Sequence, residues 1–200
     1  MSIKHKDQRI GIFIDTQNLY HSAKNLYGGA RVNFNAVMKD AVAGRGLIRA
    51  LAYMVTTEAG DERAFIEALG KIGIEVKSKE LQIFVDGSKK ADWDVGLAVD
   101  AIKSAPKLDT VIIGSGDGDF VPLIQYLKEN MGVQVEVIAF GKSSSAKLRE
   151  VADDFLDLCE NPRKYLIITG NGGYKKMRGP VAGKSAEQLA KPEETSTLEK

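Results

Sequence analysis

The sequence is poor in the residues that form disulfides and bind soft metals. Its 200 residues include one cysteine, Cys159, and two histidines. A single cysteine excludes an intrachain disulfide and a cysteine-based zinc site, and we expect a reducing, cytoplasmic environment. A metal centre in this chain would have to use oxygen ligands, which are typical of Mg²⁺ or Mn²⁺ sites and not of zinc sites.

Long apolar runs and an excess of either charge are also missing. No apolar run approaches the roughly 20 residues of a membrane span, and the polar residues 1–8 contain no signal-peptide core. We therefore expect neither membrane insertion nor secretion through this segment. Lysine and arginine number 28 against 27 acidic residues, which leaves a net charge of +1. Net charge selects no partner, although a local basic patch would be enough to bind nucleic acid.

Apolar periodicity alternates between the strand and helix patterns over residues 9–160. Buried strands are predicted at 9–14, 47–57, 74–79, 111–113 and 133–140, and residues 81–85 are predicted as a short strand or hairpin arm. Helices are predicted from the end of the first strand to about 27, and at 34–44, 61–73, 93–105 and 121–130. Because parallel strands need crossover connections, this alternation predicts an α/β fold, a three-layer α/β/α arrangement with a mainly parallel central sheet.

The ends of the chain differ in composition from its middle. Residues 1–8 form a polar lead, residues 9–168 the predicted domain, and residues 169–200 are rich in Gly, Lys, Glu, Ser and Thr. Such a segment buries too little apolar surface to offset the entropy of ordering, so we expect a flexible polar tail. Its basic cluster, Tyr174, Lys175, Lys176 and Arg178, could contact a nucleic-acid backbone, but a solvated tail is the favoured interpretation.

Carboxylates follow two of the predicted strands. Asp15 ends the first strand, and Asp117 and Asp119 follow the strand at 111–113. Since the carboxyl ends of parallel strands meet at one edge of a sheet, the three are expected to gather there if the strands are neighbours. Like charges raise one another's pKa, and a divalent cation would offset them. The alternative is that Asp117 or Asp119 is the N-cap of the next helix, which explains one aspartate but not all three.

A second acidic group precedes the predicted helix at 93–105. Asp92 and Asp94 flank Trp93, where the helix dipole favours negative charge and an N-cap is needed, so one of them is expected to be structural. Asp100 lies six residues beyond Asp94, about 240° around the helix, and cannot share its face. Asn18, three residues after Asp15, could face the same cleft, although taken alone an asparagine there is more often a helix-start residue than a ligand.

Neither glycine-rich segment matches a phosphate-binding loop. The glycines of "GSGDGD" stand at 114, 116 and 118, which is the wrong spacing for a dinucleotide fingerprint. The segment "GKSSS" at 141–145 lacks the earlier glycine of a P-loop, because that position is Glu136. Ser144 or Ser145 is instead expected to cap the helix that follows.

Three segments together resemble the NYN domain, in its LabA-like bacterial branch, which groups with PIN-like nucleases. They are "IGIFIDTQNL", "KKADWDVGLAVDAI" and "VIIGSGDGDFVPLI", in the family's order, within residues 9–160. The resemblance implies a PIN-like fold and an acidic centre of Asp15, Asn18, Asp94, Asp117 and Asp119. Asp100 matches a recurrent aspartate of the family, whereas Asp92 stands where a glycine is often found.

The residues and the resemblance together predict a metal-dependent nuclease, with RNA favoured over DNA. Mg²⁺ or Mn²⁺ would be bound by Asp15, Asp94, Asp117 and Asp119, and Asn18 would orient a water or a phosphate oxygen. The loop glycines would leave room for a bulky sugar-phosphate chain. Predicted substrate contacts are Lys89, Lys90, Ser115, Lys142 and Lys147.

Two other functions stay open at this point. A phosphatase with an aspartyl nucleophile, as in haloacid-dehalogenase-like folds, would need an aspartate at position 17, where the chain has Gln17. A non-catalytic module that binds RNA or a protein could keep the same acidic residues as a structural or regulatory metal site. The exposed edge strands of a parallel sheet could also pair two copies in a homodimer.

Overall fold

The computed structural model describes residues 4–56, 62–80, 82–83, 89–90 and 93–167, so the predicted tail at 169–200 lies outside the described residues. The strands are β1 (Arg9–Asp15), β2 (Arg31–Val32), β3 (Gly46–Thr56), β4 (Glu75–Glu80), β5 (Gln82–Ile83), β6 (Lys89–Lys90), β7 (Thr110–Gly114), β8 (Gln134–Ala139), β9 (Asp154–Asp157) and β10 (Leu166–Ile167). The helices are α1 (Thr16–Leu26), α2 (Phe34–Val42), α3 (Arg63–Lys71), α4 (Asp94–Ser104), α5 (Val121–Met131), α6 (Ala146–Val151) and α7 (Pro162–Tyr165), with 3₁₀ turns η1 (Ala105–Lys107), η2 (Gly118–Phe120) and η3 (Gly141–Ser143).

Six strands form a central sheet in the order β4-β3-β1-β7-β8-β9, and every neighbouring pair is parallel. The chain runs outward from β1 through β3 to β4, then crosses to β7 on the other side of β1 and continues outward to β9. The order of strands therefore reverses between β1 and β7. In open α/β sheets, the carboxyl ends of the strands at such a point form the usual ligand-binding crevice.

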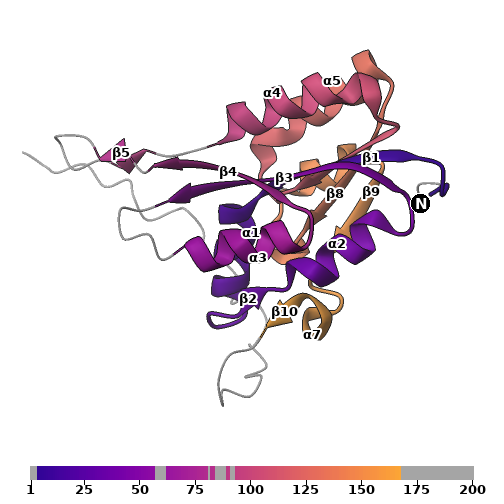
Figure 1. Ribbon diagram of the computed structural model, residues 1–200. Helices are drawn as coiled ribbons and strands as arrows, with labels where there is room; N and C mark the ends of the chain where they lie inside the picture. The colour runs from indigo at the N-terminus through magenta and orange to yellow at the C-terminus, as the bar shows by residue number, and fades with distance from the viewer. Residues whose placement is uncertain (1–3, 57–61, 81, 84–88, 91–92, 168–200) are drawn as a thin grey trace, which may run out of the picture. The chain divides into compact units, whose positions relative to one another are not determined.

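Helices cover both faces of this sheet, which confirms the predicted three-layer fold (Figure 1). Side chains alternate along β1, so that Ile12 and Ile14 pack with α1, α2 and α3, whereas Phe13 packs with α4, α5 and α6. This alternation follows from the two-residue period of a strand. Each face thus has its own apolar cluster, and together they hold β1 and β7 rigidly at the centre. None of the described helices has the length and apolarity that a membrane crossing requires.

Local end signals predicted one helix start correctly and another wrongly. Asn33 is the N-cap of α2, and its side chain accepts the Ala36 N–H at 3.2 Å, as predicted. Ser145 occupies the N-cap position of α6, but no side-chain capping hydrogen bond forms there. The Ser144 hydroxyl instead donates to the Phe140 carbonyl at 2.9 Å. The predicted serine cap is therefore wrong, because Ser144 bonds to the preceding turn and Ser145 makes no capping hydrogen bond.

Candidate functional site

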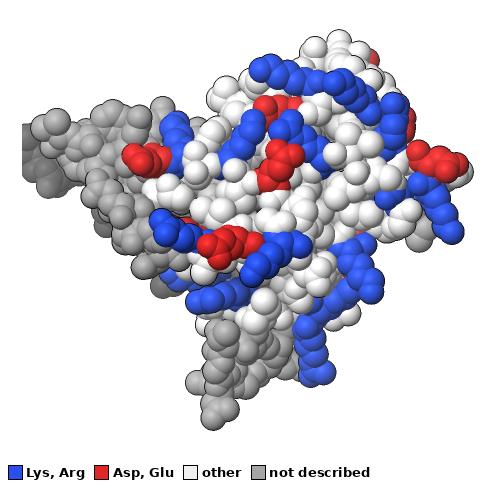
Figure 2. Space-filling view, in the orientation of Figure 1, with Lys and Arg blue, Asp and Glu red and all other residues white. Residues whose placement is uncertain are grey.

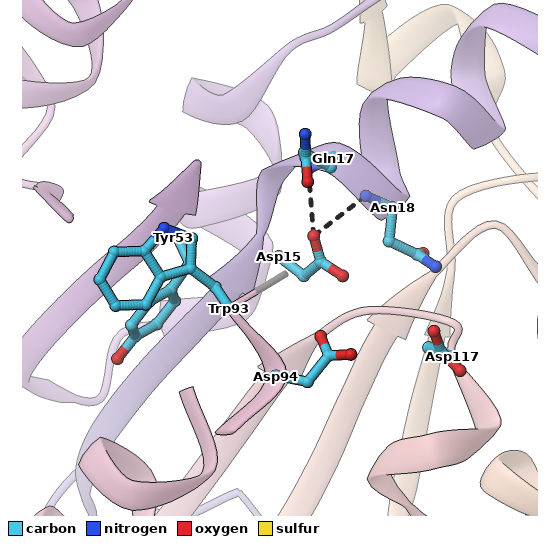
Figure 3. Close-up of a pocket in the computed structure, with 7 residues that line it drawn as sticks. All are labelled: Asp15, Gln17, Asn18, Tyr53, Trp93, Asp94 and Asp117. Atoms are coloured by element: carbon cyan, nitrogen blue, oxygen red, sulfur yellow. Dashed lines mark hydrogen bonds between the residues drawn. The ribbon is translucent and has the colours of Figure 1, made fainter. Parts of the chain in front are cut away.

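A cavity of about 210 Å³ lies where β1 and β7 end (Figure 3). Its walls come from the end of β1, the start of α1, β3, the start of α4 and the loop after β7. The lining residues are Asp15, Gln17, Asn18, Tyr53, Trp93, Asp94 and Asp117. Three of the four aspartates predicted for the acidic centre, together with Asn18, therefore share one cavity.

Asp15 is held by three hydrogen bonds at the point where β1 becomes α1. One carboxylate oxygen, Oδ1, accepts the backbone N–H groups of Gln17 and Asn18, both at 3.1 Å, so that Asp15 is the N-cap of α1. The other, Oδ2, accepts the Ser115 hydroxyl at 3.4 Å. The sequence analysis missed this capping role, although an aspartate between an apolar strand and a helix is a common N-cap signal.

Burial dominates the electrostatics of Asp15. Burial raises the pKa of its carboxyl, the hydrogen bonds from Asn18, Gln17 and Ser115 oppose that rise, and the nearby charge of Asp117 adds a smaller increase. Mutual repulsion was expected to be the main effect, and it is instead the smallest of these causes. Among the described side chains, no lysine or arginine forms an ion pair with Asp15. Within the part of the chain that the structure describes, its negative charge is stabilised by the dipoles of these hydrogen-bond donors.

Asn18 joins the two strand ends that frame the cavity. Its Oδ1 accepts the backbone N–H of Gly116 at 2.9 Å, which ties the start of α1 to the loop after β7. Gly116 also packs so closely against Ser144 that an added Cβ would lie 2.5 Å from the serine Oγ. At Gly114 an added Cβ would lie 3.1 Å from Ile14 Cγ1. These two glycines therefore serve close packing within the protein, and not the open approach for substrate that we expected.

Asp117 and Asp119 have different surroundings despite their proximity in sequence. Asp117 is the N-cap of η2, and its Oδ1 accepts the N–H of Asp119 at 3.0 Å. Its own N–H donates to the Ser115 hydroxyl at 3.2 Å. The alternative of a structural cap is thus correct for Asp117, which nevertheless lines the cavity. Asp119 is exposed and is not among the cavity residues, so this predicted ligand stands apart from the other three.

The predicted substrate contacts fall into three groups. Ser115 is fully buried, and its hydroxyl bonds to Asp15 and to the Asp117 backbone, so it positions the acidic residues. Lys142 in η3 and Lys147 in α6 are exposed. The side chains of Lys89 and Lys90, and all of Asp92, lie outside the described residues.

An aromatic wall, Tyr53 and Trp93, forms one side of the cavity and was missed by the sequence analysis. The rings lie 5.7 Å apart at 57°, and the Tyr53 hydroxyl donates to Asp100 at 2.8 Å. Lys77 also donates to Asp100, at 2.6 Å. Burial acts to raise the pKa of Asp100, but these two hydrogen bonds outweigh it and lower the pKa. As the helical geometry predicted, Asp100 does not share the site of Asp94.

The donor set of the cavity suits a hard, hydrated cation. Among the described residues, no three Asp, Glu, His or Cys side chains are close enough to hold one ion together. Mg²⁺ commonly binds through one or two carboxylates and keeps several waters, and it needs no complete cage of protein ligands. Asp15, Asp94 and Asp117 supply carboxylate oxygens around one cavity, and the buried charge of Asp15 would be stabilised by a cation. The residues present therefore fit such an ion.

Comparisons with known proteins identify the family and support the fold. The NYN domain model matches residues 9–159, from β1 through β9. The Low amplitude and bright protein LabA of Synechococcus elongatus is 26% identical over 163 residues, which cover 76% of this chain and 85% of LabA. The crystal structure of a protein of unknown function from Vibrio parahaemolyticus is 31% identical, with a TM-score of 0.74, and the match covers 83% of this chain and 100% of that one. The chain therefore belongs to the NYN domain family, in its LabA-like branch.

Proposed function

We propose that the protein is a metal-dependent nuclease that hydrolyses phosphodiester bonds, with RNA as the favoured substrate. The observation that carries the proposal is the convergence of Asp15, Asp94 and Asp117 on one cavity at the point where the strand order reverses. Membership of the NYN family supports a nuclease or another RNA-related role. Hydrolysis would add one water across a P–O bond, leaving a phosphate on one product and a hydroxyl on the other.

Each cavity residue has a distinct part in this proposal. Asp15, Asp94 and Asp117 would offer one or two carboxylates to Mg²⁺ or Mn²⁺, with waters as the other ligands, and the bound ion would lower the pKa of a water and offset charge on the phosphate. The hydrogen bonds to Asp15 from α1 and Ser115 hold its carboxylate in place before substrate arrives. The Oδ1 of Asn18 accepts the Gly116 N–H, so its Nδ2 could donate to a phosphate oxygen or a water.

Lysines would bind the sugar-phosphate backbone in this proposal. Lys142 is exposed in the turn that follows β8, next to the Ser144 that packs on Gly116. Lys89 and Lys90 stay predicted contacts, as does exposed Lys147. Lysine, arginine and acidic residues alternate over the face in Figure 2, so binding would depend on a local basic patch. Phosphate contacts of this kind weaken steeply as salt rises.

We also propose a cytoplasmic location, and the homodimer stays a prediction.

The test is cleavage of labelled single-stranded RNA by the full chain with Mn²⁺, beside a chelator control. Asp117→Asn is the matched variant, because an asparagine can still accept the Asp119 N–H and keep the cap. We expect Asp117→Asn to abolish cleavage with an unchanged or higher melting temperature. Loss of folding in this variant would show that Asp117 is required as a cap and would leave its catalytic role without support.

A non-catalytic RNA- or protein-binding module is the second candidate. The observation that favours it is the lack, among the described residues, of three ligands close enough to share an ion. RNA binding without any Mn²⁺-dependent cleavage would support this candidate and overturn the first. A phosphatase is disfavoured, because the cavity presents Gln17 where an aspartyl-nucleophile enzyme needs a carboxyl. Release of phosphate from a small monoester would reverse that judgement.

A further inference from the structure

The single tryptophan of the chain is fixed in orientation at the edge of the acidic cavity. Its indole Nε1 donates to the Met54 carbonyl of β3 at 2.9 Å. Its six-membered ring packs on Gly96 in the first turn of α4, where an added Cβ would lie 2.5 Å from Trp93 Cε3. The indole therefore has no freedom to rotate away from either β3 or α4. Trp93 is nevertheless only half-buried and lines the cavity.

Tyr53 supports the indole from within the protein. Its ring is almost fully buried and tilted against Trp93, and its hydroxyl is held by Asp100, which Lys77 holds in turn. Figure 3 shows both rings on one side of Asp15, with Asn18 and Asp117 on the other. The cavity thus has a rigid aromatic side and an oxygen-rich side. A residue needed only for packing would not have to border the acidic groups.

We propose that Trp93 is a stacking platform for one unpaired nucleobase, beside the acidic site. The inference rests on the proposed function in one respect, namely that the acidic groups receive a nucleic-acid phosphate. A nucleotide has an anionic phosphate and a flat aromatic base close together, which matches the two sides of the cavity. Aromatic side chains bind bases of any sequence in this way, because every base has a π-face. A base inside a duplex is paired and stacked, so the site would select single-stranded nucleic acid or an unpaired loop.

The platform can be tested by fluorescence, because Trp93 is the only tryptophan among the 200 residues. The full chain would be titrated at low salt, in a chelator that prevents turnover, with a short single-stranded RNA. The controls are the same strand with its bases replaced by abasic sugars and a blunt duplex of equal length. We expect saturable quenching by the single strand and little quenching by either control. Equal quenching by the abasic strand would mean that the indole contacts sugar or phosphate, and would overturn the proposal.

Substitutions measure how much the stacking contributes. We expect Trp93→Leu to weaken binding of a labelled single strand by about 5- to 150-fold, the range of one base–aromatic stack. Binding of the abasic strand should be unchanged, and Trp93→Phe should keep most of the affinity. An equal loss for both strands would indicate general damage to the site and count against stacking. If Trp93→Leu unfolds, the Trp93→Phe variant and the quenching of the unaltered chain still decide the question.

Failure of this proposal is distinguishable from failure of the nuclease proposal. Base-dependent quenching without Mn²⁺-dependent cleavage would support the platform and reject hydrolysis. Cleavage without base-dependent quenching would support hydrolysis and reject the platform. If no strand binds at low salt, the platform is rejected whatever the cleavage assay shows.

Discussion

Two carboxylates of the central sheet, one buried and one half-buried, are stabilised in different ways. Glu136 of β8 has a side chain that is 5% exposed, and it faces the Arg45 guanidinium, which is 1% exposed. Two short hydrogen bonds join them, from Nη1 to Oε1 at 2.7 Å and from Nη2 to Oε2 at 2.9 Å. Arg45 also donates to the carbonyls of Ala41 and Val42, so its charge is fully bonded.

Asp15 has no such cation among the described side chains. It accepts two backbone N–H groups and one hydroxyl, which are neutral donors that stabilise a charge without cancelling it. Glu136 is neutralised inside the fold and is closed to any external cation. Asp15 keeps a net negative charge beside a cavity. The difference teaches that a carboxylate paired within the protein serves the fold, whereas a carboxylate held only by dipoles beside a cavity is a candidate for neutralisation by a ligand.

The largest expected effect comes from breaking the internal pair. Arg45→Ala would leave the buried Glu136 carboxylate without its main partner, and we expect the free energy of unfolding to fall by about 3–5 kcal/mol. Urea unfolding measures this. The double variant Arg45→Met with Glu136→Leu should recover most of the loss, since no charge is then left buried. A small effect of the single variant would show that Lys4, 3.6 Å from Glu136, replaces Arg45.

Changes at Asp15 should affect stability far less and depend on the residue chosen. Asp15→Ala removes the cap of α1 and should cost about 1 kcal/mol. Asp15→Asn keeps an oxygen for the two N–H groups and removes a carboxylate whose pKa is raised by burial, so it should be neutral or stabilising. Both variants should lose any thermal stabilisation by Mn²⁺. A strong loss of stability in Asp15→Asn would mean that the charge itself holds the fold together.

A change at Ser115 tests the comparison of Asp15 with Glu136, because Ser115 supplies one of the neutral donors to Asp15. We expect Ser115→Ala to lower the free energy of unfolding by about 1 kcal/mol, since the buried hydroxyl donates to Asp15 and accepts from Asp117. Thermal unfolding beside Ser144→Ala, in the same region, provides the matched measurement. If Ser115→Ala instead weakens RNA binding at unchanged stability, the original prediction of a substrate contact is restored.

The smallest effect is expected at an exposed pair, Arg9 and Asp109. Hydrogen bonds from the Arg9 side chain and backbone lower the pKa of Asp109 to about 2. The unfolded carboxyl, with a pKa of about 3.9, takes up its proton first as the pH falls. The pair therefore stabilises the fold above about pH 4, and this contribution is lost as the pH drops towards 2. Asp109→Asn should flatten this part of the pH–stability profile slightly, and salt should reduce the difference.

Local patterns in the sequence were sufficient for most of the architecture, although β9, an edge strand of the central sheet, was not predicted. The apolar runs that end at Asp15 and before Gly114 predicted β1 and β7, because a buried strand needs only a short stretch of apolar side chains. They were not sufficient for the details of the site. Three details depend on the directions of side chains from segments remote in sequence. They are the position of Asp119 outside the cavity that Asp117 lines, the burial of Ser115, and the contact between Tyr53 and Trp93.

By itself the sequence determined the α/β fold and the carboxylates at the ends of two strands, because local periodicity marks both, and three of its segments were enough to indicate the family by resemblance. The tertiary structure alone decided which carboxylates share a cavity, how the charge of Asp15 is stabilised and that an aromatic wall stands beside it. The physical reason is that burial and side-chain contacts are set by the register of β1 between β3 and β7, which joins segments about 40 to 100 residues apart.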